Sequence, residues 1–118
     1  MINQAVILCG GLGTRLLPIT KKIPKPMVMI NNKPFLEHLI IQCKENGIQN
    51  FLLLCGYKKE LIQKYFKNGE KLGVKIKYHF NASNIKTFKR LLDAKKLLNK
   101  KFLLLYGDNY SSLNLFDL

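Results

Sequence analysis

Residues 5–13 read AVILCGGLG, an apolar run that stops at closely spaced glycines. An apolar run without polar alternation is typical of a parallel strand buried on both faces of a sheet. Glycines at positions 10, 11 and 13 let backbone N–H groups approach a phosphate closely. The stretch therefore predicts a buried strand that leads into a phosphate-binding loop. Taken alone it fits a simple tight turn equally well, because it contains neither Gly-x-Gly-x-x-Gly nor Gly-Lys-Ser/Thr.

Beyond this stretch, apolar runs alternate with helical patterns. Helices are expected from Pro34 to Asn46, over 59–66 and over 87–98, and strands over 27–30, 51–55, 74–80 and 102–106. This order predicts one domain over 1–118, a three-layer α/β/α, Rossmann-like and mostly parallel sheet. Ligands bind such sheets beyond the carboxyl ends of the strands. Glycines at 10, 56 and 107 follow three of those ends.

Composition narrows the function classes. The chain has 118 residues, 47% of them hydrophobic, which excludes a largely disordered protein. No apolar run approaches the ~20 residues of a membrane span, and no signal peptide is recognisable, so we expect a cytoplasmic protein. The net charge of +13 comes mostly from scattered lysines, since only Arg15 and Arg90 are arginines. Scattered lysine favours solvated faces over a nucleic-acid stripe and remains compatible with a polyphosphate ligand.

Several reactive side chains are expected to be structural. The chain has three cysteines, Cys9, Cys43 and Cys55. An odd number without Cys-x-x-Cys spacing argues against a disulfide framework or a zinc site, so buried free thiols are predicted. Glu37 is expected to be a solvated helix position, and His38 is not expected to act as a base.

Leu91, Leu92 and Leu98 are expected on the apolar side of the helix over 87–98.

Residues 10–27 read GGLGTRLLPITKKIPKPM, and Lys33-Pro34 follows. This stretch strongly resembles the signature of the sugar nucleotidyltransferases, the pyrophosphorylases that make nucleoside-diphosphate sugars. The resemblance implies that a nucleoside triphosphate reacts with a sugar 1-phosphate to give a nucleotide-sugar and pyrophosphate, with Mg²⁺ as cofactor, on a route to surface polysaccharide.

The resemblance also implies roles for individual residues. Arg15 would hold the leaving pyrophosphate, Lys25 would neutralise the reacting phosphates, and Asp108 would bind magnesium. These assignments suit the planar donors of arginine and the mobile charge of lysine. The nucleotide-binding positions implied by the resemblance are Leu8, Gly10, Gly11, Gly13, Thr14, Gly56, Tyr57 and Thr87.

Two departures from the family pattern leave alternatives open. Lys86 and Lys89 stand where the family has glycines, and they either block the base pocket or point to solvent. The resemblance covers only the first half of a family domain, without its second metal-binding aspartate. A non-catalytic remnant that binds a nucleotide weakly, or acts through a partner chain, is therefore the alternative to an enzyme. A basic binding protein that uses the same fold for RNA or for a protein partner is a third hypothesis. The base, the sugar and a homo-oligomeric state are not assigned.

Overall fold

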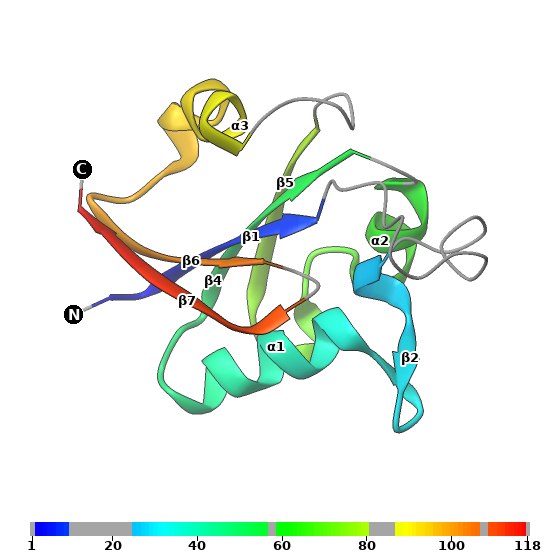
Figure 1. Ribbon diagram of the computed structural model, residues 1–118. Coiled ribbons are helices and arrows are strands. Elements are labelled where there is room, and N and C mark those ends of the chain that lie inside the picture. Colours follow the sequence, from blue (N-terminus) through cyan, green and yellow to red (C-terminus); the bar gives the residue numbers. More distant parts are fainter. Residues whose placement is uncertain (1, 10–24, 57–58, 81–86, 107–108, 118) are drawn as a thin grey trace.

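A central five-stranded sheet organises the protein. The computed structural model describes residues 2–9, 25–56, 59–80, 87–106 and 109–117 (Figure 1). The strands of the sheet are β1 (Gln4–Cys9), β4 (Asn50–Cys55), β5 (Lys75–Phe80), β6 (Lys101–Tyr106) and β7 (Asn109–Asp117). Their order is β5-β4-β1-β6-β7, with the first four parallel and β7 antiparallel to β6. The predicted fold class is confirmed.

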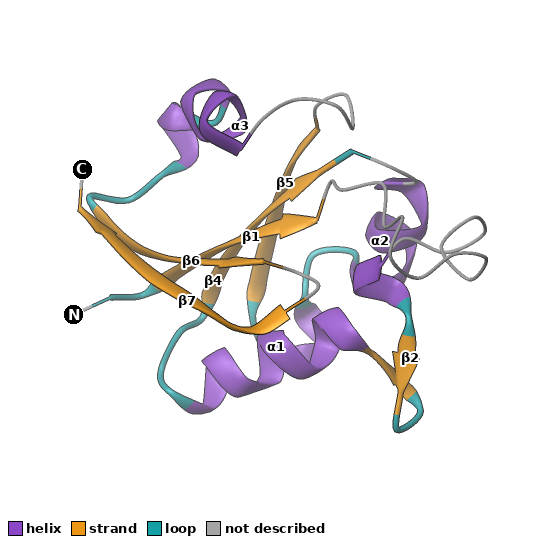
Figure 2. Cartoon of the chain, viewed as in Figure 1, coloured by secondary structure: helices purple, strands orange, loops and turns teal. Residues whose placement is uncertain are grey.

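Helices cover both faces of this sheet. They are α1 (Phe35–Glu45), α2 (Lys59–Phe66) and α3 (Thr87–Asp93), with single 3₁₀ turns η3 (Lys25–Met27), η4 (Glu70–Leu72) and η5 (Lys95–Leu97). Figure 2 shows α1 and α2 on one side of the sheet and α3 on the other. None of the described helices is long and apolar enough to cross a membrane.

The core consists of two layers separated by the sheet. Alternation along each strand sends successive side chains to opposite faces. The layer under α1 and α2 includes Ala5, Ile7, Cys9, Leu36, Ile40, Phe51, Leu53, Ile62 and Phe66. The layer under α3 and η5 includes Val6, Leu52, Leu54, Ala94, Phe102 and Leu104. Strand β1 contributes to both layers and is buried along almost its whole length, as its unbroken apolar run predicts.

A short hairpin joins η3 to α1. Its strands are β2 (Met29–Ile30) and β3 (Lys33–Pro34). Asn31 and Asn32 between them have φ of 51° and 68°, a left-handed conformation that asparagine tolerates and that two-residue hairpin turns need. The backbone N–H of Phe35 donates to the oxygen of Val28 at 2.9 Å, and Nε2 of His38 lies 2.6 Å from the oxygen of Ile30. The hairpin is thereby fastened to the first turn of α1.

Helix α3 is shorter than expected. It ends at Asp93, and the chain tightens into η5, where the N–H of Leu97 donates to the oxygen of Ala94 at 2.8 Å. A 3₁₀ turn has fewer residues per turn than an α-helix, so it rotates the following side chains relative to the α-helical pattern. Ala94 and Leu97 consequently pack toward the sheet, whereas Leu92 is 52% exposed. The expectation that Leu92 belongs to the apolar side was wrong.

Strand β7 was not predicted. Its sequence, NYSSLNLFD, places Asn and Ser where a strand pattern would have apolar or β-branched residues. Antiparallel pairing with β6, with Leu103 opposite Leu115 and Phe102 opposite Phe116, supplies the regularity that the local sequence lacks.

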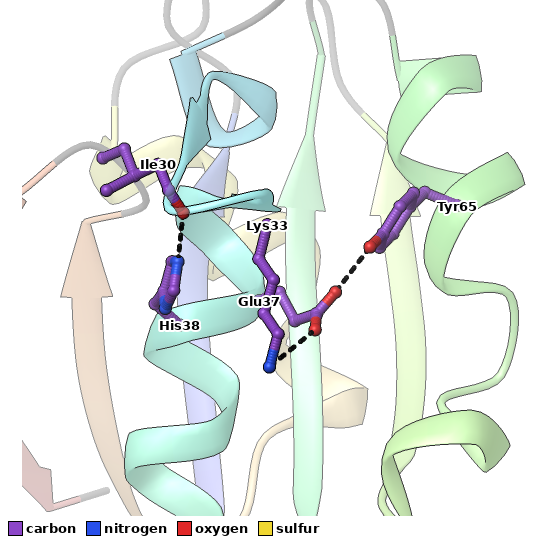
Figure 3. A network of polar contacts seen from close by, with 5 residues as sticks. All are labelled: Ile30, Lys33, Glu37, His38 and Tyr65. Carbon is purple, nitrogen blue, oxygen red and sulfur yellow. Dashed lines mark hydrogen bonds and ion pairs between the residues drawn. The ribbon is translucent and has the colours of Figure 1, made fainter.

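Glu37 is buried rather than solvated, which corrects the expectation from the sequence. It is 7% exposed, and its Oε1 accepts a hydrogen bond of 2.6 Å from the hydroxyl of Tyr65 on α2 (Figure 3). Lys33 Nζ lies 3.9 Å from the other carboxylate oxygen. A buried carboxylate needs such partners, and the helical pattern of α1 alone gives no sign of a donor on α2. The hydrogen bond to Glu37 raises the pKa of Tyr65 to about 12.

Replacing Tyr65 with Phe should lower the free energy of unfolding by about 1–2 kcal/mol, because Glu37 loses its closest donor while it stays buried. Lys33→Ala should cost less than about 0.5 kcal/mol, since that lysine is half exposed and 3.9 Å from the carboxylate. Urea unfolding of both variants beside the unmodified chain measures the difference. Equal losses for the two variants would contradict the assignment of Tyr65 as the main partner.

The three thiols should be inert in the folded chain. Cys9, Cys43 and Cys55 are buried thiols outside any disulfide, as predicted, and burial raises the pKa of Cys43 to about 11. Thiolate is the reactive form, so at neutral pH a thiol reagent should label the native protein slowly and label all three cysteines after unfolding in urea. Mass spectrometry of labelled protein checks this, and rapid labelling without denaturant would show that the core opens readily.

Candidate functional site

Four parallel strands end at one edge of the sheet. In the registers, Cys9 lies opposite Cys55, Cys55 opposite Phe80, and Leu8 opposite Tyr106. Positions 10, 56, 81 and 107 follow these ends in the sequence, so the predicted glycine turns all start from the same edge. In an open parallel sheet this is the edge at which ligands bind. The pairing thus brings together the chain segments that carry the predicted site.

The structure describes four of the predicted site residues. Leu8 is partly buried and packs toward the layer under α3. Lys25 begins η3, Thr87 begins α3, and Gly56 follows β4, where its oxygen accepts a hydrogen bond of 3.3 Å from the N–H of Lys59. The other predicted residues lie outside the described ranges: Gly10, Gly11, Gly13, Thr14, Arg15, Tyr57 and Asp108.

The turn η3 places Lys25 beside two helices. Met27, at the end of this turn, packs against the core layer that α1 and α2 cover. The hydrogen bonds of Phe35 and His38 to the adjoining hairpin, and the Glu37–Tyr65 bond between α1 and α2, fix the same region. The turn that begins with Lys25 therefore lies in a region where α1, α2 and the hairpin are fixed to one another.

A cation that the sequence analysis did not select lies at the same edge. Lys59, at the start of α2, places its Nζ 4.6 Å from the ring centroid of Phe80, the last residue of β5. The Phe80 ring in turn stacks on Tyr78 with centroids 5.9 Å apart. A cation above an aromatic face is attracted to it and held in place. The only signal in the sequence is that Lys59 follows the Gly56 turn by three residues.

Tyr78, the second ring of this aromatic pair, is itself fixed by a hydrogen bond. Its hydroxyl donates to the oxygen of Lys67 at 2.6 Å. Burial, with smaller contributions from the sulfurs of Cys55 and Cys9, raises the pKa of Tyr78 above its usual range. The phenol therefore stays neutral and keeps its hydrogen-bond donor at any physiological pH.

Lys89, one of the two lysines that depart from the family pattern, points to solvent. Its side chain is 63% exposed, and its Nζ lies 3.3 Å from the carboxylate of Asp93 one turn along α3. Of the two alternatives for this residue, the structure supports the solvent-facing one. Lys86 lies outside the described residues.

Within the described ranges, no three His, Cys, Asp or Glu side chains gather as a metal site would require. The described part of the chain therefore contributes three features to the site. They are the backbone at the strand ends, the Lys59 cation held over the Phe80 ring, and the turn that begins with Lys25. The predicted magnesium ligand, Asp108, follows β6 by two residues and lies outside that part.

Comparison with known proteins finds relatives that are named as nucleotidyltransferases for sugar 1-phosphates. A D-glycero-alpha-D-manno-heptose 1-phosphate guanylyltransferase of Campylobacter jejuni is 45% identical over 112 residues, which are 95% of this chain and 50% of the relative. The UTP–glucose-1-phosphate uridylyltransferase AglF of Haloferax volcanii is 37% identical over 97% of this chain and 46% of its own length. The crystal structure of HddC from Yersinia pseudotuberculosis superposes with a TM-score of 0.79 at 33% identity, over 91% of this chain and 48% of that one.

The HddC structure shares the fold of this chain, and the chain spans about half of the length of each of these three relatives. The family described as nucleotidyl transferase matches residues 4–117, almost the whole sequence. The chain therefore belongs to the nucleotidyl transferase family.

Proposed function

We propose that this chain forms the nucleotide-binding part of a sugar-1-phosphate nucleotidyltransferase. One observation carries the proposal: the signature over residues 10–27 begins directly after β1, the central strand between β4 and β6, and ends in η3. A phosphate chain bound there would meet the glycine turn at one end and Lys25 at the other. The guanylyltransferase relative makes GTP and a heptose 1-phosphate the first substrate pair to test.

In the proposed reaction, an oxygen of the sugar 1-phosphate attacks the α-phosphorus of the nucleoside triphosphate. A new phosphorus–oxygen bond forms, the bond from the α-phosphorus to the bridging oxygen breaks, and pyrophosphate leaves with the electron pair. The protein supplies no nucleophile, so its contribution is positioning and neutralisation of charge. Lys25 would neutralise the reacting phosphates, and Arg15 would hold the departing pyrophosphate through its planar donors.

Magnesium belongs to this proposal. The carboxylate of Asp108 has the hard oxygen ligands that Mg²⁺ prefers, and bound Mg²⁺ would withdraw charge from the phosphate oxygens. The glycines at 10, 11 and 13 would donate backbone N–H groups to the nucleotide, together with the turn at Gly56 and Tyr57. Leu8, Thr14 and Thr87 would complete the nucleotide side of the pocket.

Nucleotide affinity tests the proposed roles of Arg15 and Lys25. Arg15→Ala and Lys25→Ala should each weaken GTP binding in the presence of Mg²⁺ about tenfold, because each removes a charge-assisted contact to phosphate. Lys101→Ala is the matched control, because this exposed lysine begins β6 at the opposite end of the strands. Titration calorimetry gives the dissociation constants. Equal weakening by all three variants would indicate non-specific attraction to a basic protein.

Lys89→Ala should leave GTP affinity within about twofold of the unmodified chain, because its side chain faces solvent and pairs with Asp93. The same calorimetry measures it. A gain in affinity of about tenfold would mean that Lys89 obstructs the base pocket.

Turnover separates the enzyme from the alternative of a remnant that only binds. The 118 residues span about half of the length of these relatives, and we expect this span by itself to bind GTP but to release pyrophosphate slowly or not at all. A coupled pyrophosphate assay with GTP and a heptose 1-phosphate measures the rate. Robust turnover that disappears in Lys25→Ala would show that this half suffices for catalysis.

A further inference from the structure

A groove of about 790 Å³ lies between the hairpin and α2, on the α1 side of the molecule. Its walls are mainly apolar and include Met27, Met29, Leu61, Tyr65, Phe66 and Leu72. Met29 is 56% exposed, Leu61 40% and Tyr65 44%, and these three are among the five exposed large hydrophobic residues of the described chain. Clustering of this kind is unusual on a soluble surface and marks a place where another molecule binds.

A row of lysines runs along the groove. Lys64, Lys67 and Lys71 come from α2 and the segment that follows it, and all three line the groove. The ion pairs that the structure shows between described residues are Lys33–Glu37 and Lys89–Asp93, and neither includes a lysine of this row. Glu60 on α2 and Glu70 on η4 belong to the same segment but do not line the groove. Glu37 is the one acidic residue in the lining, and its carboxylate is already engaged by Tyr65 and Lys33. The groove is thus apolar inside and positive along one side.

Charge and shape together select the occupant. A second copy of this chain, docked face to face across a two-fold axis, would set lysine row against lysine row. A flat membrane could reach the exposed Met29 but not Phe66, which is only 5% exposed in the same groove. A polypeptide segment with apolar side chains on one face and carboxylates on the other satisfies both requirements.

We propose that the groove is a docking site for an acidic amphipathic segment of a partner protein. The apolar side chains of that segment pack against Leu61, Tyr65 and Leu72, and its carboxylates meet Lys64 and Lys71. The hydrogen bond from Tyr65 to Glu37 fixes the tyrosine ring before anything binds, which lowers the ordering cost of association (Figure 3). This inference concerns a surface outside the strand-end site and does not depend on the proposed reaction.

Peptide selection on the full chain tests the proposal. A phage-displayed random peptide library is panned against the unmodified chain and, in parallel, against Leu61→Asp. We expect peptides that combine Asp or Glu with Leu, Ile or Phe to be enriched on the unmodified chain alone. The best peptide is then labelled, and its affinity is measured by fluorescence anisotropy beside a scrambled version and a version with Lys in place of every acidic residue.

Matched variants on the opposite face control for general effects. Leu61→Asp should weaken binding of the acidic peptide about tenfold or more. Leu92→Asp, at another exposed leucine on α3, should change the affinity less than about twofold. Lys64→Glu with Lys71→Glu should abolish binding of the acidic peptide and allow the Lys version to bind, whereas Lys95→Glu with Lys96→Glu on η5 should do neither. The charge reversals keep the test valid if Leu61→Asp disturbs folding.

Four results would overturn the proposal. They are the absence of any enriched peptide, enrichment of basic peptides, equal loss of affinity in the α1-side and α3-side variants, and equal binding of the scrambled peptide. Two further measurements identify other occupants and would overturn it in the same way. One is concentration-dependent self-association that Leu61→Asp abolishes, and the other is binding to phosphatidylserine–phosphatidylcholine vesicles that acidic peptides do not displace.

Discussion

In-register parallel pairing around β1 is the constraint on which the rest of the molecule depends. β1 is hydrogen-bonded on both sides, to β4 and to β6, and it contributes side chains to both core layers. Because the partners run parallel and without register shifts, their carboxyl ends coincide. A slip of one residue would turn Val6 and Ile7 to the wrong layers, so burial fixes the register. The coincidence of the strand ends is therefore a consequence of core packing, and the site inherits its geometry from it.

A second, polar constraint fastens the segment that follows the signature. Glu37 is placed in the apolar layer by its position on α1, and it is tolerated there because Tyr65 and Lys33 supply partners. The bond ties α1 to α2, while the Phe35 and His38 hydrogen bonds tie α1 to the hairpin. The turn that begins with Lys25 thus packs against α1 and α2, and the Glu37–Tyr65 hydrogen bond helps to set the spacing of those two helices. An apolar residue at position 37 could not accept the hydrogen bond that orients Tyr65.

Features that depend on the local sequence pattern were predicted correctly. Features that depend on contacts between residues distant in the chain were missed. The strands 51–55 and 102–106, the helix over 59–66 and the turn at Asn31 follow from periodicity and turn chemistry, and all are confirmed. β7, the burial of Glu37 and the Lys59–Phe80 contact depend on residues far away in the chain, which no window of sequence reveals. The signature indicated the predicted site, yet most of that site falls outside the described residues, so its roles stay predictions.

The groove and the strand-end site share one structural element. Met27 lines the groove and belongs to the same 3₁₀ turn as Lys25. A ligand that shifts this turn on binding in the groove must therefore alter the position of the lysine backbone. If nucleotide affinity depends on that position, the two binding events are coupled, and each changes the affinity of the other by the same factor. The Tyr65–Glu37 bond opposes such a shift, since moving α2 against α1 would leave the buried carboxylate without its closest donor. That hydrogen bond is therefore one restraint on coupling that would move α2 against α1.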